Sequence, residues 1–257
     1  MPMISGKRVI AAMLTALMAV TFTANTAVSV YATGVTATEN AQTIDAQSTD
    51  AQALTPEEQK AQELQQVYDM PVESNGYKDW PQGPGTYGEA GIVMEVGTGA
   101  ILYAKNIDAH EYPASITKVL TELVALENGQ LTDNVTFSHD SVAFLQRGDS
   151  SVGLKEGNVI TLDQAMHAML LASANEAAYA IGESVGVNAG HDYNWFIEQM
   201  NSRCKELGGE NSNFANTNGL HDPNHYTCAR DMALIGRELF KHPEFFQIVQ
   251  TLNYTIP

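Results

Sequence analysis

The spacing of hydrophobic residues along this chain changes at Pro113, and that change limits the fold to few classes. Before it, residues 91–96 and 100–105 are two apolar runs on either side of Gly97-Thr98-Gly99. Runs of this kind around a glycine-rich turn predict an antiparallel hairpin. After Pro113, apolar residues return every three or four positions, which is the period of a helix. Two early strands followed by a helical block indicate an α+β domain.

Five helices are expected in this block. The first ends at Gly129, and the second begins at a capping box, Thr161-Leu162-Asp163-Gln164, and ends near Ala172. The other three are predicted over residues 175–185, 193–207 and 227–242, with Gly208-Gly209 and Pro243 ending the last two. Near the C-terminus only residues 253–256 look strand-like. An α+β domain normally has a wider sheet than one hairpin supplies.

The N-terminus has the residue order of an export signal. Lys7-Arg8 precede an apolar run over residues 9–22, and small residues follow up to Ala32. This order predicts a signal peptide over residues 1–32, so that the domain works outside the cytoplasmic membrane, in the cell envelope or secreted. The alternative is an uncleaved membrane anchor, although the apolar run is short for a bilayer span.

The next segment, residues 33–85, is rich in Thr, Ala, Gln and acidic residues and then in Pro and Gly. Apart from a short helix after Thr55, it is predicted to be a low-complexity spacer. Residues 86–257 are then the folded domain.

The chain carries 30 acidic against 13 basic residues. Phosphate backbones are bound by basic surfaces, so nucleic acid is excluded as an expected partner. Cys204 and Cys228 allow one disulfide or none, and two buried free thiols are the preferred interpretation. His221 and His225 lie in a loop rich in Pro and Asn, where solvated histidines are more frequent than zinc ligands. We expect no metal and no cofactor.

A Ser-x-x-Lys motif, Ser115-Ile116-Thr117-Lys118, opens the first long helix. Residues three apart on a helix project from one face, so the Lys118 amine is predicted to reach the Ser115 hydroxyl. A helix start also favours negative charge and offers backbone N–H donors to an oxyanion. Burial of the lysine would favour its neutral form and make it a base near neutral pH. Alone, the motif also fits a capping serine followed by a surface lysine.

A second motif, Ser173-Ala174-Asn175, follows the second helix about sixty residues later. A junction of two helices with polar caps has the same composition. Two motifs in this order are, however, typical of one class of acyl-transfer enzymes.

The two motifs resemble those of the serine D-alanyl-D-alanine carboxypeptidases, the low-molecular-weight penicillin-binding proteins. The resemblance covers residues 90–257, with further similar stretches at residues 98–103, 113–121, 170–178, 200–208 and 216–221. It implies a β-lactamase/transpeptidase-like domain, in which an antiparallel sheet packs with a helical block.

The resemblance also implies the chemistry. Ser115 would attack a D-alanyl-D-alanine carbonyl while Lys118 takes its proton, and Ser173 would relay a proton to the leaving amine. Asn175 would bind the substrate's peptide group or position Lys118. The implied partners are peptidoglycan stem peptides ending in D-Ala-D-Ala, trimmed in cell-wall maturation, and β-lactams as acylating inhibitors. Membrane-surface association is left open.

In this family a Lys-Thr-Gly motif on a strand follows the Ser-x-Asn element by roughly a hundred residues, and this sequence stops before that point. We therefore expect a fragment of a longer product, whose C-terminal strands of the sheet are missing.

Two other functions fit parts of the sequence. A class A-like β-lactamase needs a glutamate to activate water, and Glu210 lies in a plausible region but in a stretch unlike that family's. A non-catalytic protein that binds peptidoglycan or β-lactams would keep Ser115 and Lys118 without turnover.

Overall fold

The structure is a computed structural model that describes residues 54–256. The chain divides into two compact units, residues 1–65 and 66–257. In the first unit the described part belongs mostly to helix α2 (Pro56–Tyr68), which begins at a capping box formed by Thr55 and Glu58. The short helix predicted after Thr55 is thus confirmed. The predicted signal peptide, residues 1–32, lies outside the described residues.

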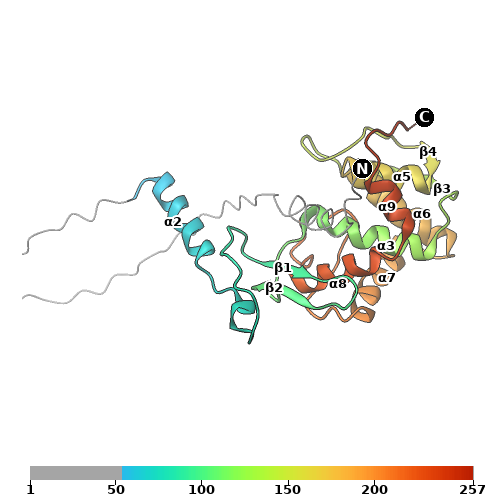
Figure 1. Ribbon diagram of the computed structural model, residues 1–257. Coiled ribbons are helices and arrows are strands. Elements are labelled where there is room, and N and C mark those ends of the chain that lie inside the picture. Colours follow the sequence, from blue (N-terminus) through green and yellow to red (C-terminus); the bar gives the residue numbers. More distant parts are fainter. Residues whose placement is uncertain (1–53, 257) are drawn as a thin grey trace, which may run out of the picture. The chain divides into compact units, whose positions relative to one another are not determined.

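The second unit begins with the predicted hairpin (Figure 1). Strand β1 (Gly91–Met94) pairs antiparallel with β2 (Ile101–Lys105), and Ile92 lies opposite Ala104 on the buried face. Between the strands, the Glu95 carboxylate accepts a hydrogen bond of 3.0 Å from the backbone N–H of Gly97. The buried face of the hairpin packs on helix α8 (Ala229–Leu239). The hairpin prediction is confirmed.

Residues 67–86 run along β2. In the short 3-10 helix η1 (Glu73–Gly76), Ser74 Oγ accepts a hydrogen bond from the backbone N–H of Ala104 in β2. Trp80 Nε1 donates a hydrogen bond to the backbone oxygen of Leu102, also in β2. The buried Lys105 ammonium donates to Val67 O and Thr86 O at 2.5 and 2.6 Å. The sequence assigns this segment to the spacer because the segment has no regular spacing of apolar residues. Its contacts with β2 are made by single side chains, which produce no such pattern. The domain limits stay a prediction.

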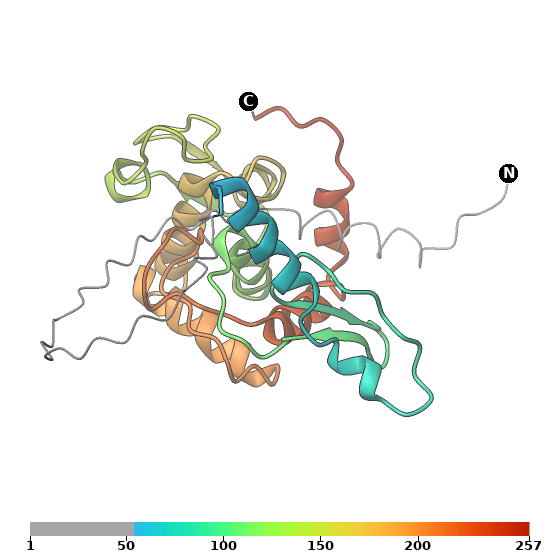
Figure 2. The ribbon, with the colours of Figure 1, turned by 90° about the vertical axis from the view of Figure 1, so that its left-hand side faces the viewer.

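Helix α3 (Lys118–Asn128) is the centre of the helical block. Helices α5 (Leu162–Leu171), α6 (Asn175–Asn188), α7 (Tyr193–Glu206) and α8 all contact it, and Figures 1 and 2 show the green α3 among these yellow to red helices. Leu120 and Leu123 on α3 are completely buried. The helix predicted after Pro113 is confirmed, and its apolar residues lie in the core.

Three of the predicted boundaries hold closely. The capping box before α5 is present, since Thr161 N donates to Gln164 Oε1 at 2.9 Å and Gln164 N donates to Thr161 Oγ1 at 3.2 Å. Helix α7 ends just before Gly208, which adopts a left-handed φ of 93°. Helix α6 begins at Asn175 as predicted and runs three residues beyond the predicted end at 185.

The helix predicted over residues 227–242 is confirmed as α8, which is shorter at both ends. Helix α8 ends at Leu239, and Pro243 opens a separate helix, α9 (Pro243–Val249). Proline is favoured at the first helical position because its missing N–H has no partner there in any helix. Pro243 is thus a start signal here.

Short elements were missed. Strands β3 (Asn134–Thr136) and β4 (Val159–Thr161) pair antiparallel, and helix α4 (His139–Ala143) follows β3. Residues 253–256, predicted to be strand-like, form no strand in the structure. The described residues thus hold two antiparallel two-stranded sheets and a helical block, which is the expected α+β class.

Candidate active site

Ser115 and Lys118 meet where a 3-10 turn leads into the central helix. Ser115 lies in η2 (Ala114–Thr117), and Lys118 is the first residue of α3. The prediction placed both in one α-helix. In a 3-10 turn, side chains three apart eclipse each other, which brings Lys118 Nζ within 3.1 Å of Ser115 Oγ. The serine side is open to solvent, whereas Lys118 is only 2% exposed.

Three acceptors surround the Lys118 amine. It donates to Ser115 Oγ, to Asn175 Oδ1 at 2.8 Å and to the backbone oxygen of Asn218 at 2.7 Å. Burial lowers the pKa of Lys118 to about 8, although the charge of Glu176 acts in the opposite direction. A substantial fraction of this lysine is therefore neutral near physiological pH.

The Ser-x-Asn element reaches the same point from the junction of α5 and α6. Ser173 has a left-handed φ of 56°, and its Oγ donates to Ser115 Oγ at 3.0 Å. Asn175 begins α6 and is 4% exposed. The four residues singled out in the sequence thus form one connected group, Ser173–Ser115–Lys118–Asn175.

The loop of residues 213–226 forms the other side of this group, and the sequence motifs did not assign it a role. Its Thr217 carbonyl accepts from Thr121 Oγ1 at 2.7 Å, one turn along α3 from Lys118. Together with the bond from Lys118 to Asn218 O, this fastens the loop to the start of α3. The similar stretch at residues 216–221 was the only sequence signal for it.

His225 ties the same loop to the Ser-x-x-Lys turn. Its Nε2 is 2.7 Å from Thr117 Oγ1, and its Nδ1 accepts from Ala215 N at 3.0 Å. Because Nδ1 accepts, the neutral ring carries its proton on Nε2 and donates it to Thr117. Burial lowers the pKa of His225 to about 4, which keeps the ring neutral. The expectation of a solvated His225 is wrong, whereas His221 is exposed.

Gly219 permits the close approach of the loop. It has a left-handed φ of 83°, and a Cβ added there would overlap the Ala114 carbonyl group and lie 3.0 Å from Ser115 N. Ala114 itself has φ 47°. The backbone around the nucleophile is thus shaped by two chain segments that touch without side chains between them.

The two cysteines and Glu210 are not part of the Ser115 group. Cys204 and Cys228 are buried free thiols, as expected, and burial raises their pKa values to about 11 and about 12. Within residues 54–256 no group of His, Cys, Asp and Glu side chains is arranged to hold a metal ion. Glu210, the candidate of the β-lactamase alternative, is exposed between α7 and α8.

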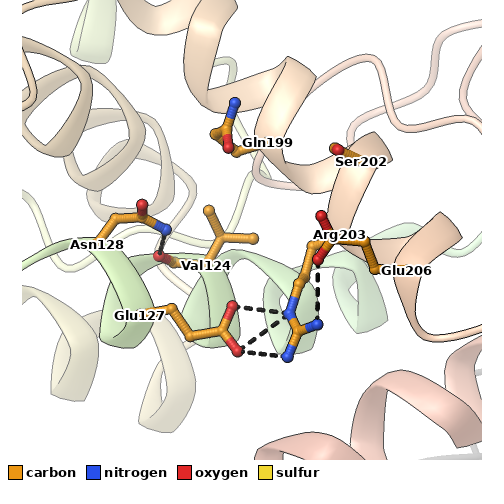
Figure 3. A pocket seen from close by; sticks show the side chains of 7 residues that line it. All are labelled: Val124, Glu127, Asn128, Gln199, Ser202, Arg203 and Glu206. Carbon is orange, nitrogen blue, oxygen red and sulfur yellow. Dashed lines mark hydrogen bonds and ion pairs between the residues drawn. The ribbon is translucent and has the colours of Figure 1, made fainter.

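A surface hollow of about 300 Å³ lies at the opposite end of α3 (Figure 3). Arg203 of α7 pairs there with Glu127 at 2.8 Å and with Glu206 at 3.2 Å. Glu127 is nine residues beyond Lys118, or roughly 14 Å along the helix at its rise of about 1.5 Å per residue. The hollow is therefore separate from the Ser115 group.

Comparison with known proteins shows which family the chain resembles. Residues 81–256 match the family model described as D-alanyl-D-alanine carboxypeptidase. The D-alanyl-D-alanine carboxypeptidase DacA of Haemophilus influenzae is 34% identical over 170 residues, which cover 64% of this chain and 42% of that protein. DacF of Bacillus subtilis is 32% identical over 168 residues, 63% of this chain and 41% of that protein.

Solved structures agree. Penicillin-binding protein 5 from Haemophilus influenzae superposes with a TM-score of 0.61 at 29% identity, over 68% of this chain and 52% of the other. The Streptomyces K15 DD-transpeptidase gives 0.57 at 28% identity, over 62% of this chain and 63% of the other. The fold is that of the penicillin-binding transpeptidases.

The chain belongs to the D-alanyl-D-alanine carboxypeptidase family, since the family match covers more than half of it. It spans less than half the length of the two carboxypeptidases compared above.

Proposed function

We propose that this protein is a serine D-alanyl-D-alanine carboxypeptidase, a hydrolase that removes the terminal D-alanine from peptidoglycan stem peptides through an acyl-enzyme on Ser115. The observation that carries the proposal is the buried Lys118 amine, held between Ser115, Asn175 and Asn218. Trimming of stem peptides would serve cell-wall maturation and cell shape.

The three partners of Lys118 support proton transfer from Ser115 to the amine in its neutral form. A neutral amine has two N–H donors and one lone pair. The Asn218 carbonyl and the Asn175 amide oxygen can only accept, so they take the two N–H groups. The lone pair then points to the remaining neighbour, the Ser115 hydroxyl. Neutral Lys118 is therefore oriented as a general base towards Ser115.

Acylation then proceeds with a balanced proton count. Ser115 Oγ attacks the carbonyl carbon of the penultimate D-alanine as its proton passes to Lys118. The C–N bond to the terminal D-alanine breaks, and the leaving amine takes the hydroxyl proton of Ser173, whose Oγ is 3.0 Å from Ser115 Oγ. Lys118 replaces that proton with the one it took from Ser115 and is neutral again. In the second half-reaction water attacks the ester as one of its protons passes to Lys118. The ester C–O bond breaks, Lys118 returns the proton to Ser115 Oγ, and the trimmed peptide is released. Asn175 keeps the amine in place during both steps.

Ser115 also sits where an oxyanion could be stabilised. It lies in the turn that leads into α3, and helix starts favour negative charge and offer free N–H groups. We assign the Ser115 backbone N–H as one oxyanion donor.

Covalent capture by a β-lactam tests the nucleophile. The protein is incubated with benzylpenicillin and its intact mass is measured, beside a Ser115→Ala variant. A gain of one penicillin in the parent protein alone is expected. The acylation rate should rise with pH through a midpoint near the Lys118 pKa of about 8, because only the neutral amine is a base. A folded protein that gains no mass, or a Ser115→Ala protein that gains it equally, would refute the proposal.

Release of free D-alanine from a peptide ending in D-Ala-D-Ala tests turnover. The expected result is release by the parent protein and none by Ser115→Ala or Lys118→Ala. Acylation without D-alanine release would favour the non-catalytic binder, and fast hydrolysis of nitrocefin would favour a β-lactamase.

The proposal includes export to the cell envelope, on the basis of the signal-like order of residues 1–32. Within residues 54–256 no helix is both long and apolar enough to cross a bilayer. N-terminal sequencing of the protein from the producing cells tests the predicted cleavage after Ala32. An intact Met1 would contradict it.

A further inference from the structure

The residue after Asn175 makes an unusual set of contacts. Glu176 is completely buried, and a single oxygen, Oε1, accepts three hydrogen bonds from one loop. The donors are Ser151 Oγ at 2.6 Å, Val152 N at 2.8 Å and Gly153 N at 3.1 Å. Consecutive N–H groups converging on one carboxylate oxygen form a backbone nest. The chain uses it to hold the loop of residues 150–153.

The same loop has a second tie to the start of α6. Asn175 N donates to Ser150 O at 2.9 Å. Residues 150–153 themselves are exposed, and Gly153 adopts a left-handed φ of 80°. Two consecutive residues, Asn175 and Glu176, thus hold this exposed loop by hydrogen bonds. The first of them, Asn175, also binds Lys118. The loop therefore stands beside the Ser115 group.

Glu176 also acts electrostatically on the Lys118 amine. Its second oxygen, Oε2, is buried and has no hydrogen-bond partner within residues 54–256. Of the charged groups around Lys118, it is the one whose charge raises the pKa of the amine, against the larger effect of burial.

The charged groups on the other elements around α3 are engaged elsewhere. Asp163 of α5 acts on Glu122, whose own pKa burial raises to about 8. His225 in the adjacent loop is neutral, because burial lowers its pKa to about 4. Asp231 of α8 accepts bonds from residues 211 and 212, and Arg203 of α7 lies at the far end of α3.

We propose that Glu176 is a positioning residue of the Ser115 site, which fixes the 150–153 loop beside the site and places a negative charge one residue from Asn175, the partner of the Lys118 amine. The proposal rests on the proposed function only in taking Lys118 as the base. One side chain then controls two properties, the position of the loop and the proton affinity of the amine.

Two substitutions separate these properties. Glu176→Gln removes the charge and keeps one acceptor oxygen for the loop, whereas Glu176→Ala removes both. Glu183→Gln is the matched control, because Glu183 lies on the same helix two turns further and binds Ser138. Ser151→Ala removes two loop bonds without changing charge, the one that Ser151 Oγ donates to Glu176 and the one that it accepts from Gly153 N. It replaces Glu176→Ala if that protein does not fold.

Two measurements that need no turnover test the proposal. The first is the NMR titration of the Lys118 side chain, assigned with Lys118→Ala. The second is amide hydrogen exchange at Val152 and Gly153. Glu176→Gln should move the titration midpoint about 1 pH unit lower, as expected on loss of a nearby opposite charge, with exchange unchanged. Glu176→Ala should also speed exchange at Val152 by at least about ten-fold, because that amide loses its acceptor. Gly153 N keeps a second acceptor, Ser151 Oγ, at 2.9 Å.

Ser151→Ala should speed exchange and leave the midpoint where it is, and Glu183→Gln should change neither. The proposal fails if Glu176→Gln titrates like Glu183→Gln. It fails equally if exchange at Val152 in Glu176→Ala matches that of the parent protein. A parent protein that is not acylated by benzylpenicillin, but shows the expected titration and exchange, would overturn the proposed function and leave the role of Glu176 standing.

Discussion

A Gly219→Ala substitution adds one carbon where the 213–226 loop meets the Ser115 turn. A left-handed backbone costs alanine about 1 kcal/mol relative to glycine. The added Cβ also overlaps the Ala114 carbonyl group, and forced overpacking costs about 1–3 kcal/mol more. We expect the free energy of unfolding to fall by about 2–4 kcal/mol. Because the loop must retreat, Asn218 O should leave Lys118, and acylation should slow on the order of 100-fold.

Gly190→Ala is the matched control. Gly190 has φ 82°, nearly that of Gly219, but nothing lies within 4 Å of a Cβ built there. It should lose only the backbone cost, about 1 kcal/mol, and acylate normally. Urea unfolding gives the stabilities, and the rate of mass gain with benzylpenicillin gives the acylation. Equal stabilities and equal acylation rates in the two variants would refute the close contact between Gly219 and Ala114.

Three further predictions concern buried polar groups and one helix cap. Burial raises the pKa of Glu122 from 4.5 to about 8, so the folded state holds this proton more tightly, and the resulting stability is complete below pH 4.5 and declines as pH rises to about 8. Glu122→Gln should abolish that decline in urea unfolding midpoints measured across the range, and an unchanged slope would contradict it. His225→Ala leaves Thr117 Oγ1 and Ala215 N buried without their partner, and should cost about 2–3 kcal/mol in urea unfolding; a cost within error of zero would argue against this link. Thr161→Ala removes the capping box and should cost about 1 kcal/mol while benzylpenicillin acylation stays at the parent rate; slowed acylation would show that the cap is coupled to the site.

Local signals in the sequence were sufficient for the longer elements. The capping box at Thr161 and Gln164 determines the start of α5 through contacts three residues apart. The apolar period of α3 was visible because it spans three turns. Strands of three residues such as β3 and β4 contain too few alternations to be seen. A proline such as Pro243 can mark the end of one helix or the start of the next, and the sequence alone does not distinguish the two.

The sequence predicted the four residues of the Ser115 group. It did not predict the residues that hold them in position. Ser115 and Lys118 are close in sequence, and the Ser173-Ala174-Asn175 motif is recognisable on its own. The residues that position them are distant. Asn218 lies 100 residues from the lysine that it binds, and His225 lies 108 residues from Thr117. A carbonyl oxygen is contributed by any residue type, so no side-chain pattern marks Asn218 as a partner.

The left-handed backbone at Ala114 and Ser173 restricts which amino acids these positions accept. Side chains branched at Cβ are strongly disfavoured at positive φ, whereas glycine and asparagine adopt it readily. In a saturation library selected for folded protein, valine, isoleucine and threonine codons should therefore be depleted at both positions. Glycine should survive that selection at 173 even though it has no hydroxyl group. The architecture of the site thus narrows the set of permitted sequences independently of the chemistry it performs.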